Sequence, residues 1–360
     1  MATNSIASLR ATLNSHTEAL DVRFRALFSL KGLASSSSEA AQQAIDAIGA
    51  AFKDDSALLK HELAYVLGQM QDVRAIPVLE GVLKDEEEHA MVRHEAAEAL
   101  GAISSPSSLP ILRAYEADAD VSVRETCGLA IKKIEWDNSE EGAREKARKA
   151  AGEEQSAFTP IDPAPALSSS ASAPSIASSR TLLTDASAPL FERYRAMFAL
   201  RNAVHNARRR AELPSLSDEE RKEAGEEGKQ AVLALADGLS DGSALFRHEI
   251  CFVFGELAHP ASVPSMIRVL SNDAEHEMVR HEAAEALGAV AEEEEGEEHA
   301  EVLKELKRWA EDASAPRVVR ESCVVALDEL KYNNDPTQFQ RIEPASGVAE
   351  VPSVPVAPVA

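Results

Sequence analysis

Four His-Glu dipeptides are the residues of this sequence best suited to chemistry. The dodecapeptide MVRHEAAEALGA occurs twice, at residues 91–102 and 278–289, so the chain consists of two related halves. Each half has a second His-Glu dipeptide 33 residues before the one in the dodecapeptide. Imidazole nitrogens and carboxylate oxygens bind divalent transition metals, so the pattern predicts metal sites. The four dipeptides that share the repeat position are His61-Glu62, His94-Glu95, His248-Glu249 and His281-Glu282, and a fifth, His276-Glu277, is not repeated because its counterpart is His89-Ala90.

Ligand number and spacing indicate what each half could bind. Equivalent positions on stacked helices lie about 8–10 Å apart, so His61 and His94 can reach one ion between their helices. Successive residues on a helix point about 100° apart, and we therefore expect one carboxylate per half to complete the site more naturally than both. Two imidazoles and one carboxylate form the ligand triad of non-haem iron enzymes that use oxygen. The pattern predicts two facing triads, with two carboxylates left over.

The ligand types also limit the metal. None of the three cysteines, at positions 127, 251 and 323, is in register with the His-Glu pairs. This argues against a structural zinc site and against an iron–sulfur cluster. Nitrogen and oxygen ligands in equal number favour iron or manganese, and less strongly the two zinc ions of a hydrolase.

Helical hairpins are the elements that must position these pairs. Weaker copies of the motif flank the pairs, so each half has four units, and end units that depart from the pattern are expected of a repeat array. In these outer units the histidine position holds Phe24, Glu125, Tyr194 or Glu321. The units resemble HEAT repeats, partly because Pro77 and Pro264 begin equivalent helices. This resemblance implies an all-α fold, an α-α superhelix whose two four-repeat halves face each other across a metal site.

Composition divides the chain into four segments. We predict an N-terminal half over residues 1–136 and a C-terminal half over residues 186–335. A flexible charged and Ser/Ala/Pro-rich linker is predicted for 137–185, and a disordered tail for 336–360. Because a flexible linker cannot fix the relative placement of the halves, we expect bridging ions to join them.

Charge and length exclude several classes of partner. The 360 residues carry 37 basic and 61 acidic side chains, a net charge of −24. This disfavours nucleic acid and anionic membranes and favours a cationic partner. No apolar run approaches the roughly 18 residues that span a bilayer, and three scattered cysteines do not build a disulfide framework. We expect a soluble monomer in a reducing compartment, the cytoplasm, with the nucleus as the alternative.

Taken together, the four registered His-Glu pairs in two four-unit halves resemble the deoxyhypusine hydroxylase family over residues 22–331. The resemblance implies a di-iron mono-oxygenase that uses O2 to hydroxylate the deoxyhypusine side chain of eukaryotic translation initiation factor 5A, which forms hypusine. It implies two Fe(2+) ions per chain, and it implies that Glu62 and Glu249 are either ligands or contacts to the substrate amine. The remaining implied ligands are His61, His94 and Glu95 in one half and His248, His281 and Glu282 in the other.

Two other interpretations stay open at the level of sequence. A non-catalytic HEAT-repeat scaffold would bind a partner without a stoichiometric metal, and it leaves the restriction of the pairs to the central units unexplained. A bilin-lyase-like HEAT protein would have a similar length and repeat style, but it requires chromophore-handling residues that we do not find.

Overall fold

The computed structural model describes residues 2–150, 161–167, 174–293 and 297–334. All regular structure in these ranges is helical, which confirms the prediction of an all-α fold. No helix in the described ranges is both long enough and apolar enough to cross a membrane.

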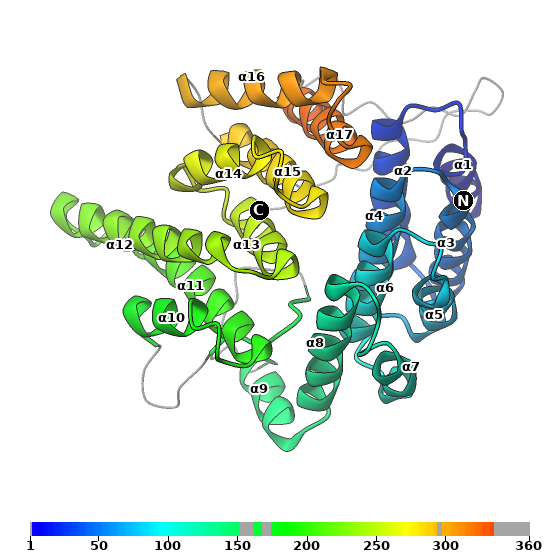
Figure 1. Ribbon diagram of the computed structural model, residues 1–360, viewed down its shortest axis with the longest axis horizontal. Coiled ribbons are helices and arrows are strands. Elements are labelled where there is room, and N and C mark those ends of the chain that lie inside the picture. Colours follow the sequence, from blue (N-terminus) through cyan, green and yellow to red (C-terminus); the bar gives the residue numbers. More distant parts are fainter. Residues whose placement is uncertain (1, 151–160, 168–173, 294–296, 335–360) are drawn as a thin grey trace.

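Four helical hairpins make the N-terminal half, and the second helix of each faces the other half of the molecule (Figure 1). The four pairs in chain order are α1 (Ala2–Leu13) with α2 (Leu20–Ala34), α3 (Ser38–Ala50) with α4 (Ala57–Gln69), α5 (Ile76–Lys84) with α6 (Ala90–Ile103), and α7 (Leu109–Ala114) with α8 (Val121–Asp137). A further helix, α9 (Glu140–Ala150), follows this half.

The C-terminal half repeats the arrangement with four more hairpins, whose second helices face α2, α4, α6 and α8 of the N-terminal half (Figure 1). The pairs are α10 (Ile176–Leu183) with α11 (Leu190–Ala211), α12 (Asp218–Ala236) with α13 (Ala244–Leu257), α14 (Val263–Leu270) with α15 (Glu277–Glu293), and α16 (Glu297–Glu311) with α17 (Arg317–Asn334). The four units expected in each half are therefore present.

A buried arginine ties the two helices of a hairpin together. Arg93 Nε of α6 donates to the backbone oxygen of Leu83, ten residues earlier at the end of α5, at 3.2 Å. The same bond recurs in three other hairpins, from Arg23 to Leu13, from Arg193 to Leu183 and from Arg280 to Leu270, at 2.9–3.0 Å. A guanidinium at the last carbonyls of a helix pairs acceptors that have no partner within that helix. Because Arg93 and Arg280 directly precede His94 and His281, the bond also sets the rotation of the helices that carry the site.

Small residues set the distance between the helices of the site. Gly68 of α4 packs on Ala99 of α6, and a Cβ built at Gly68 would lie 2.7 Å from the Ala99 Cα atom. At the equivalent position in the other half, a Cβ at Gly255 of α13 would lie 3.3 Å from the Cα atom of Ala286 in α15. Since a glycine removes the side chain at the contact, the two backbones approach closely.

Equivalent contacts join the halves at both ends of the molecule. Ser56 Oγ donates to Glu321 at 2.7 Å, and at the opposite end Ser243 Oγ donates to Glu125 at 2.6 Å. Arg25 pairs with Asp328 and lies over the ring of Tyr332 at 5.3 Å, while Arg195 lies over Trp136 at 4.6 Å. The halves therefore close into a ring through protein contacts. Bridging ions are not the only connection between them, contrary to our expectation from the sequence.

The linker predicted for residues 137–185 differs from the structure in two places. Residues 140–150 form α9, and the C-terminal half begins with α10 at Ile176 rather than at residue 186. Composition misleads here because α10 is rich in Ser and Ala, yet Ser175 caps the helix and Leu183 is fully buried. Residues 161–167 also contact the helices, because the Leu167 N–H donates to the backbone oxygen of Arg195 at 3.0 Å. The rest of the predicted linker, 151–160 and 168–173, and the predicted tail at 336–360 lie outside the described residues.

Candidate metal centre

The four His-Glu pairs lie on α4, α6, α13 and α15, where the two halves face each other across the middle of the ring. All eight side chains are buried, and the most exposed of them, Glu62, has an exposed fraction of only 8%. Charged and polar groups are rarely buried in such number unless they are paired or bind a metal.

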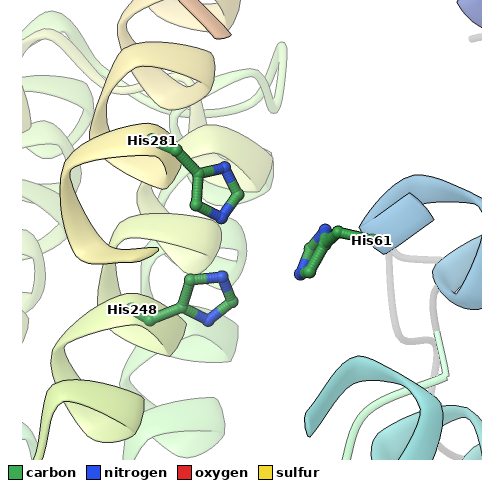
Figure 2. A group of neighbouring side chains, drawn as sticks. All are labelled: His61, His248 and His281. Carbon is green, nitrogen blue, oxygen red and sulfur yellow. The ribbon is translucent and has the colours of Figure 1, made fainter. Parts of the chain in front are cut away.

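The four imidazoles converge from both halves. Figure 2 shows His61 of α4 pointing across the interface toward His248 of α13 and His281 of α15. The ring centroid of His61 lies 5.1 Å from that of His281 and 5.5 Å from that of His94. The centroid of His248 lies 5.4 Å from those of both His94 and His281. Each half therefore presents two neighbouring imidazoles to the two of the other half.

Most of the imidazole nitrogens in this cluster lack a hydrogen-bond partner among the described residues. Both nitrogens of His94, both of His248, and the Nε2 atoms of His61 and His281 are buried without a well-directed hydrogen bond, although Nε2 of His61 and of His248 each lies within 3.3 Å of a carboxylate oxygen. Buried polar groups in proteins are nearly always satisfied, and an unpartnered nitrogen in the protein interior is costly. Metal ions would provide the missing partners, so the donor set of this chain fits a metal centre.

One carboxylate in each half lies closest to the imidazoles. Glu95 Oε2 is 3.2 Å from His61 Nε2, and ligand atoms of His61, His94 and Glu95 lie within 4.8 Å of one another. In the other half, Glu282 Oε2 is 3.3 Å from His248 Nε2 and 3.9 Å from His281 Nε2. Two more groups meet the same 4.8 Å limit, one of His281, Glu282 and Glu285 and one of His61, His248 and His281.

Glu62 and Glu249 lie beside these triads and belong to none of the compact groups found among the described residues. Glu62 Oε1 is 3.3 Å from Nδ1 of its own neighbour, His61. Burial raises the pKa of the Glu62 carboxyl, although the hydrogen bond to His61 opposes this. Burial also raises the pKa of Glu249 well above its usual range, and the charge of Glu98 adds to the shift.

Burial keeps most of the imidazoles neutral. It lowers the pKa values of His94, His248 and His281 well below the usual range, and the neighbouring imidazoles add to the effect. His61 differs, because burial lowers its pKa but the carboxylates of Glu95 and Glu62 outweigh this and hold the pKa well above 6.5. The neutral imidazole is the form that binds a metal, so three of the four rings are prepared for ligation.

Sequence reasoning missed two further carboxylates, Glu98 and Glu285. Each lies four residues after a site histidine, His94 or His281, and thus on the same face of its helix. Burial raises the pKa of Glu98 to about 8 and that of Glu285 to about 7. The signal was present in the sequence, because both repeated dodecapeptides contain a His and a Glu at this spacing.

Comparisons with known proteins agree with this architecture. A family model of HEAT repeats matches residues 45–132 and 232–335. The chain is therefore a HEAT-repeat protein with a buried His/Glu centre between its two halves. A relative from Mycosarcoma maydis, named deoxyhypusine hydroxylase, is 57% identical over 92% of this chain and 95% of its own length. One of the same name from Neurospora crassa is 47% identical, with 91% and 93% covered.

A solved structure of human deoxyhypusine hydroxylase, in complex with glycerol, is also similar. It is 44% identical to this chain, with a TM-score of 0.72 and coverage of 92% of this chain and 97% of the human one. The chain belongs to the deoxyhypusine hydroxylase family. The two alternatives, a non-catalytic scaffold and a bilin-lyase-like protein, are not favoured by these relatives.

Proposed function

We propose that this protein is a di-iron mono-oxygenase that hydroxylates the deoxyhypusine side chain of eukaryotic translation initiation factor 5A, with O2 as the oxidant, to form hypusine. Membership of the family supports the reaction. The observation that carries the metal assignment is the group of four buried imidazoles whose nitrogens lack hydrogen-bond partners among the described residues. Nitrogen and oxygen ligands with no thiolate favour iron over a structural zinc ion.

The proposed centre holds two Fe(2+) ions, one for each half. The ligands of one ion would be His61, His94 and Glu95, which form one of the compact groups. Those of the other would be His248, His281 and Glu282, where Glu282 Oε2 lies 3.3 Å from His248 Nε2 and 3.9 Å from His281 Nε2. When bound, iron would supply open coordination positions and the redox chemistry with dioxygen, and an external reductant would restore its ferrous form.

The residues around the proposed ligands would bind the substrate and exclude water. Glu62 and Glu249 are candidates to contact the substrate amine, because they lie beside the ligand triads and not within them. The substrate side chain is long, narrow and positively charged, and a protein of net charge −24 attracts it. Burial of the whole cluster removes competing water, which strengthens each contact between a carboxylate and an ammonium.

Metal analysis combined with a substrate assay tests the proposal. Purified protein loaded with iron should bind close to two ions per chain and add one oxygen atom to the deoxyhypusine-bearing factor, as measured by mass spectrometry. His94→Ala should lose at least one ion and the activity. His16→Ala, which removes an exposed histidine far from the centre along the chain, is the matched control and should keep both. Full hydroxylation by protein without a bound transition metal would contradict the proposal.

We also propose that the protein acts as a monomer in the cytoplasm, with the nucleus as the alternative compartment. Its three cysteines are free and buried, which suits a reducing compartment. Light scattering of the purified protein and fluorescence microscopy of a tagged chain test the two statements separately.

A further inference from the structure

Two pairs of carboxylates flank the metal centre, and the internal repeat makes them equivalent. Glu62 and Glu285 interact on one side, which we call the Glu62 side. Glu249 and Glu98 interact on the other side, which we call the Glu249 side. Glu62 corresponds to Glu249 and Glu285 to Glu98 in the two halves of the sequence. Any difference between the sides must therefore come from their surroundings.

The carboxyl groups of the Glu62 side have polar partners within the protein itself. Glu62 Oε1 lies 3.3 Å from His61 Nδ1. Glu285 Oε1 accepts a hydrogen bond from Ser322 Oγ at 3.2 Å and lies 3.4 Å from His281 Nδ1. The ammonium of Lys31 is near enough for its charge to act on Glu62.

The Glu249 side lacks such partners. Glu249 is only 2% exposed, and no described residue donates a hydrogen bond to it or to Glu98. Thr126 stands at the repeat position of Ser322, but its hydroxyl donates to the backbone oxygen of Ser122 at 2.8 Å and is not available to Glu98. Glu98 is half-buried, and no oxygen of Glu98 or Glu249 is both buried and without a partner, so these carboxyl groups are accessible to a cation or a donor from outside the protein.

Two more carboxyl groups, those of Asp162 and Glu256, lie on the Glu249 side. Residues 161–167 pass between the halves there, and we call this segment the strap. Asp162 of the strap binds both terminal nitrogens of Arg201, at 2.7 and 2.6 Å, and Glu256 of α13 binds the same guanidinium at 2.8 Å. The other oxygen of Glu256, Oε1, is buried without a hydrogen-bond partner among the described residues. The charges of Asp162 and Glu256 both act on Glu249.

The set of ionisable groups thus differs between the sides. The Glu249 side has four carboxylates and one guanidinium, that of Arg201. The Glu62 side has two carboxylates and Lys31, which stands at the repeat position of Arg201. A small cavity next to Glu98 is lined by Pro163 of the strap and by Lys133, whose ammonium is held by Asp137 at 2.5 Å.

We propose that Glu98 and the strap residue Asp162 help to hold the terminal ammonium of the cationic substrate side chain beside Glu249. The proposal rests on the proposed function, because it takes the substrate to be deoxyhypusine. It assigns a role to Glu98, Asp162 and Glu256, which lie outside the His-Glu pairs. It also explains why only one of the two nearly equivalent sides would bind the single substrate, because the strap crosses only that side of the centre in the described structure.

The strap is anchored well enough for this role. The Ile161 N–H donates to Gln69 Oε1 of α4 at 3.0 Å, and Arg195 Nε of α11 donates to the Pro165 oxygen at 3.3 Å. Ala164 is fully buried between these contacts. Asp162 is thus held between two anchors, one on each half of the molecule, and its carboxylate is oriented by Arg201.

A double-mutant cycle with a modified ligand tests the subsite. Iron-loaded full-length protein is kept free of oxygen, and its affinity is measured for two synthetic peptides. One peptide carries N-(4-aminobutyl)lysine and the other N-butyllysine, which lacks only the terminal amine. Wild-type protein should bind the first more tightly, and Glu98→Gln should remove roughly 10- to 100-fold of that preference, as expected for one charge-assisted hydrogen bond. Asp162→Asn should also reduce the preference.

The repeat provides the matched control. Glu285→Gln changes the equivalent carboxylate on the Glu62 side and should leave the preference for the aminobutyl peptide unchanged. Iron content is measured for every variant, so that loss of metal is separated from loss of the ammonium contact. A reduced preference in Glu285→Gln with none in Glu98→Gln or Asp162→Asn would overturn the inference but keep the proposed function. Failure of wild-type protein to bind either peptide would overturn both.

Discussion

Replacement of Gly68 by alanine tests whether backbone contact between α4 and α6 determines the geometry of the N-terminal metal site. The new Cβ would lie 2.7 Å from the Cα and 2.9 Å from the Cβ of Ala99, and ordinary contacts begin at 3.4 Å. The helices must therefore separate by roughly 0.7 Å, and such overpacking costs about 2–3 kcal/mol. Alanine recovers about 1 kcal/mol as the better helix former. We expect a net loss of about 1–2 kcal/mol in the free energy of unfolding.

Two other glycines serve as controls for this substitution. At Gly255, the equivalent position, the Cβ would lie 3.3 Å from the Ala286 Cα atom, so Gly255→Ala should be nearly neutral. At Gly128 of α8 no atom lies within 4 Å of the added Cβ, so Gly128→Ala should stabilise the protein by about 0.5–1 kcal/mol. Urea unfolding of the chelator-treated proteins gives the three values.

Iron binding provides the functional reading of the same variants. His61 and His94 lie on the two helices that Gly68→Ala forces apart, so this variant should bind iron more weakly at one of two sites. Gly255→Ala should bind both ions normally. If Gly68→Ala is as stable as the wild type, or binds both ions with unchanged affinity, then the α4–α6 contact does not control the site and the reasoning is refuted.

Three further outcomes follow from the structure. Removal of iron by a chelator should lower the melting temperature without expanding the particle in small-angle scattering, because contacts such as Ser56–Glu321 and Ser243–Glu125 close the ring without metal; an expanded apo particle would contradict this. The folded-state pKa of Glu98 is raised from 4.5 to about 8, so the contribution of this carboxyl to stability is fully present below pH 4.5 and is lost as the pH rises through 8. The difference in free energy of unfolding between metal-free Glu98→Gln and the metal-free wild type should therefore shift in favour of the variant by about 2–4 kcal/mol between pH 4.5 and pH 8. Urea unfolding at the two pH values measures this shift, and an unchanged difference would contradict the prediction. Arg25→Ala, which removes the contacts to Asp328 and Tyr332, should lower the free energy of unfolding by about 1 kcal/mol in the same assay. An unchanged free energy of unfolding would contradict this prediction.

The repeated motif predicted most of the fold, because each unit brings its own local determinants. Arg93 and Arg280 precede the site histidines in both dodecapeptides, and in the structure each binds the end of the preceding helix. Gly68 and Gly255 recur seven residues after His61 and His248, where the helices approach. Such features act within one hairpin or between neighbours, so a period in the sequence is sufficient to predict them.

Composition was a poor guide to the segment between the halves. The Ser- and Ala-rich residues 176–183 form α10, which packs on α11 through the bond from Arg193 to Leu183. Asp162 stands among Pro and Ala residues, and nothing near it in sequence indicates a partner. Its partner, Arg201, is 39 residues away and is buried against another helix.

The sequence by itself determined that each half is a four-unit helical repeat with paired imidazoles and carboxylates, since these depend on spacing along one chain. The sequence also predicted that the two sets of ligands face each other, and only the tertiary structure decided that two nearly identical halves produce unequal sides. Thr126 and Ser322 occupy equivalent repeat positions, yet one hydroxyl donates to its own helix and the other to Glu285. The physical reason is that hydrogen bonds and desolvation depend on neighbours in space, and an internal repeat does not repeat the neighbours that its copies acquire when they fold together.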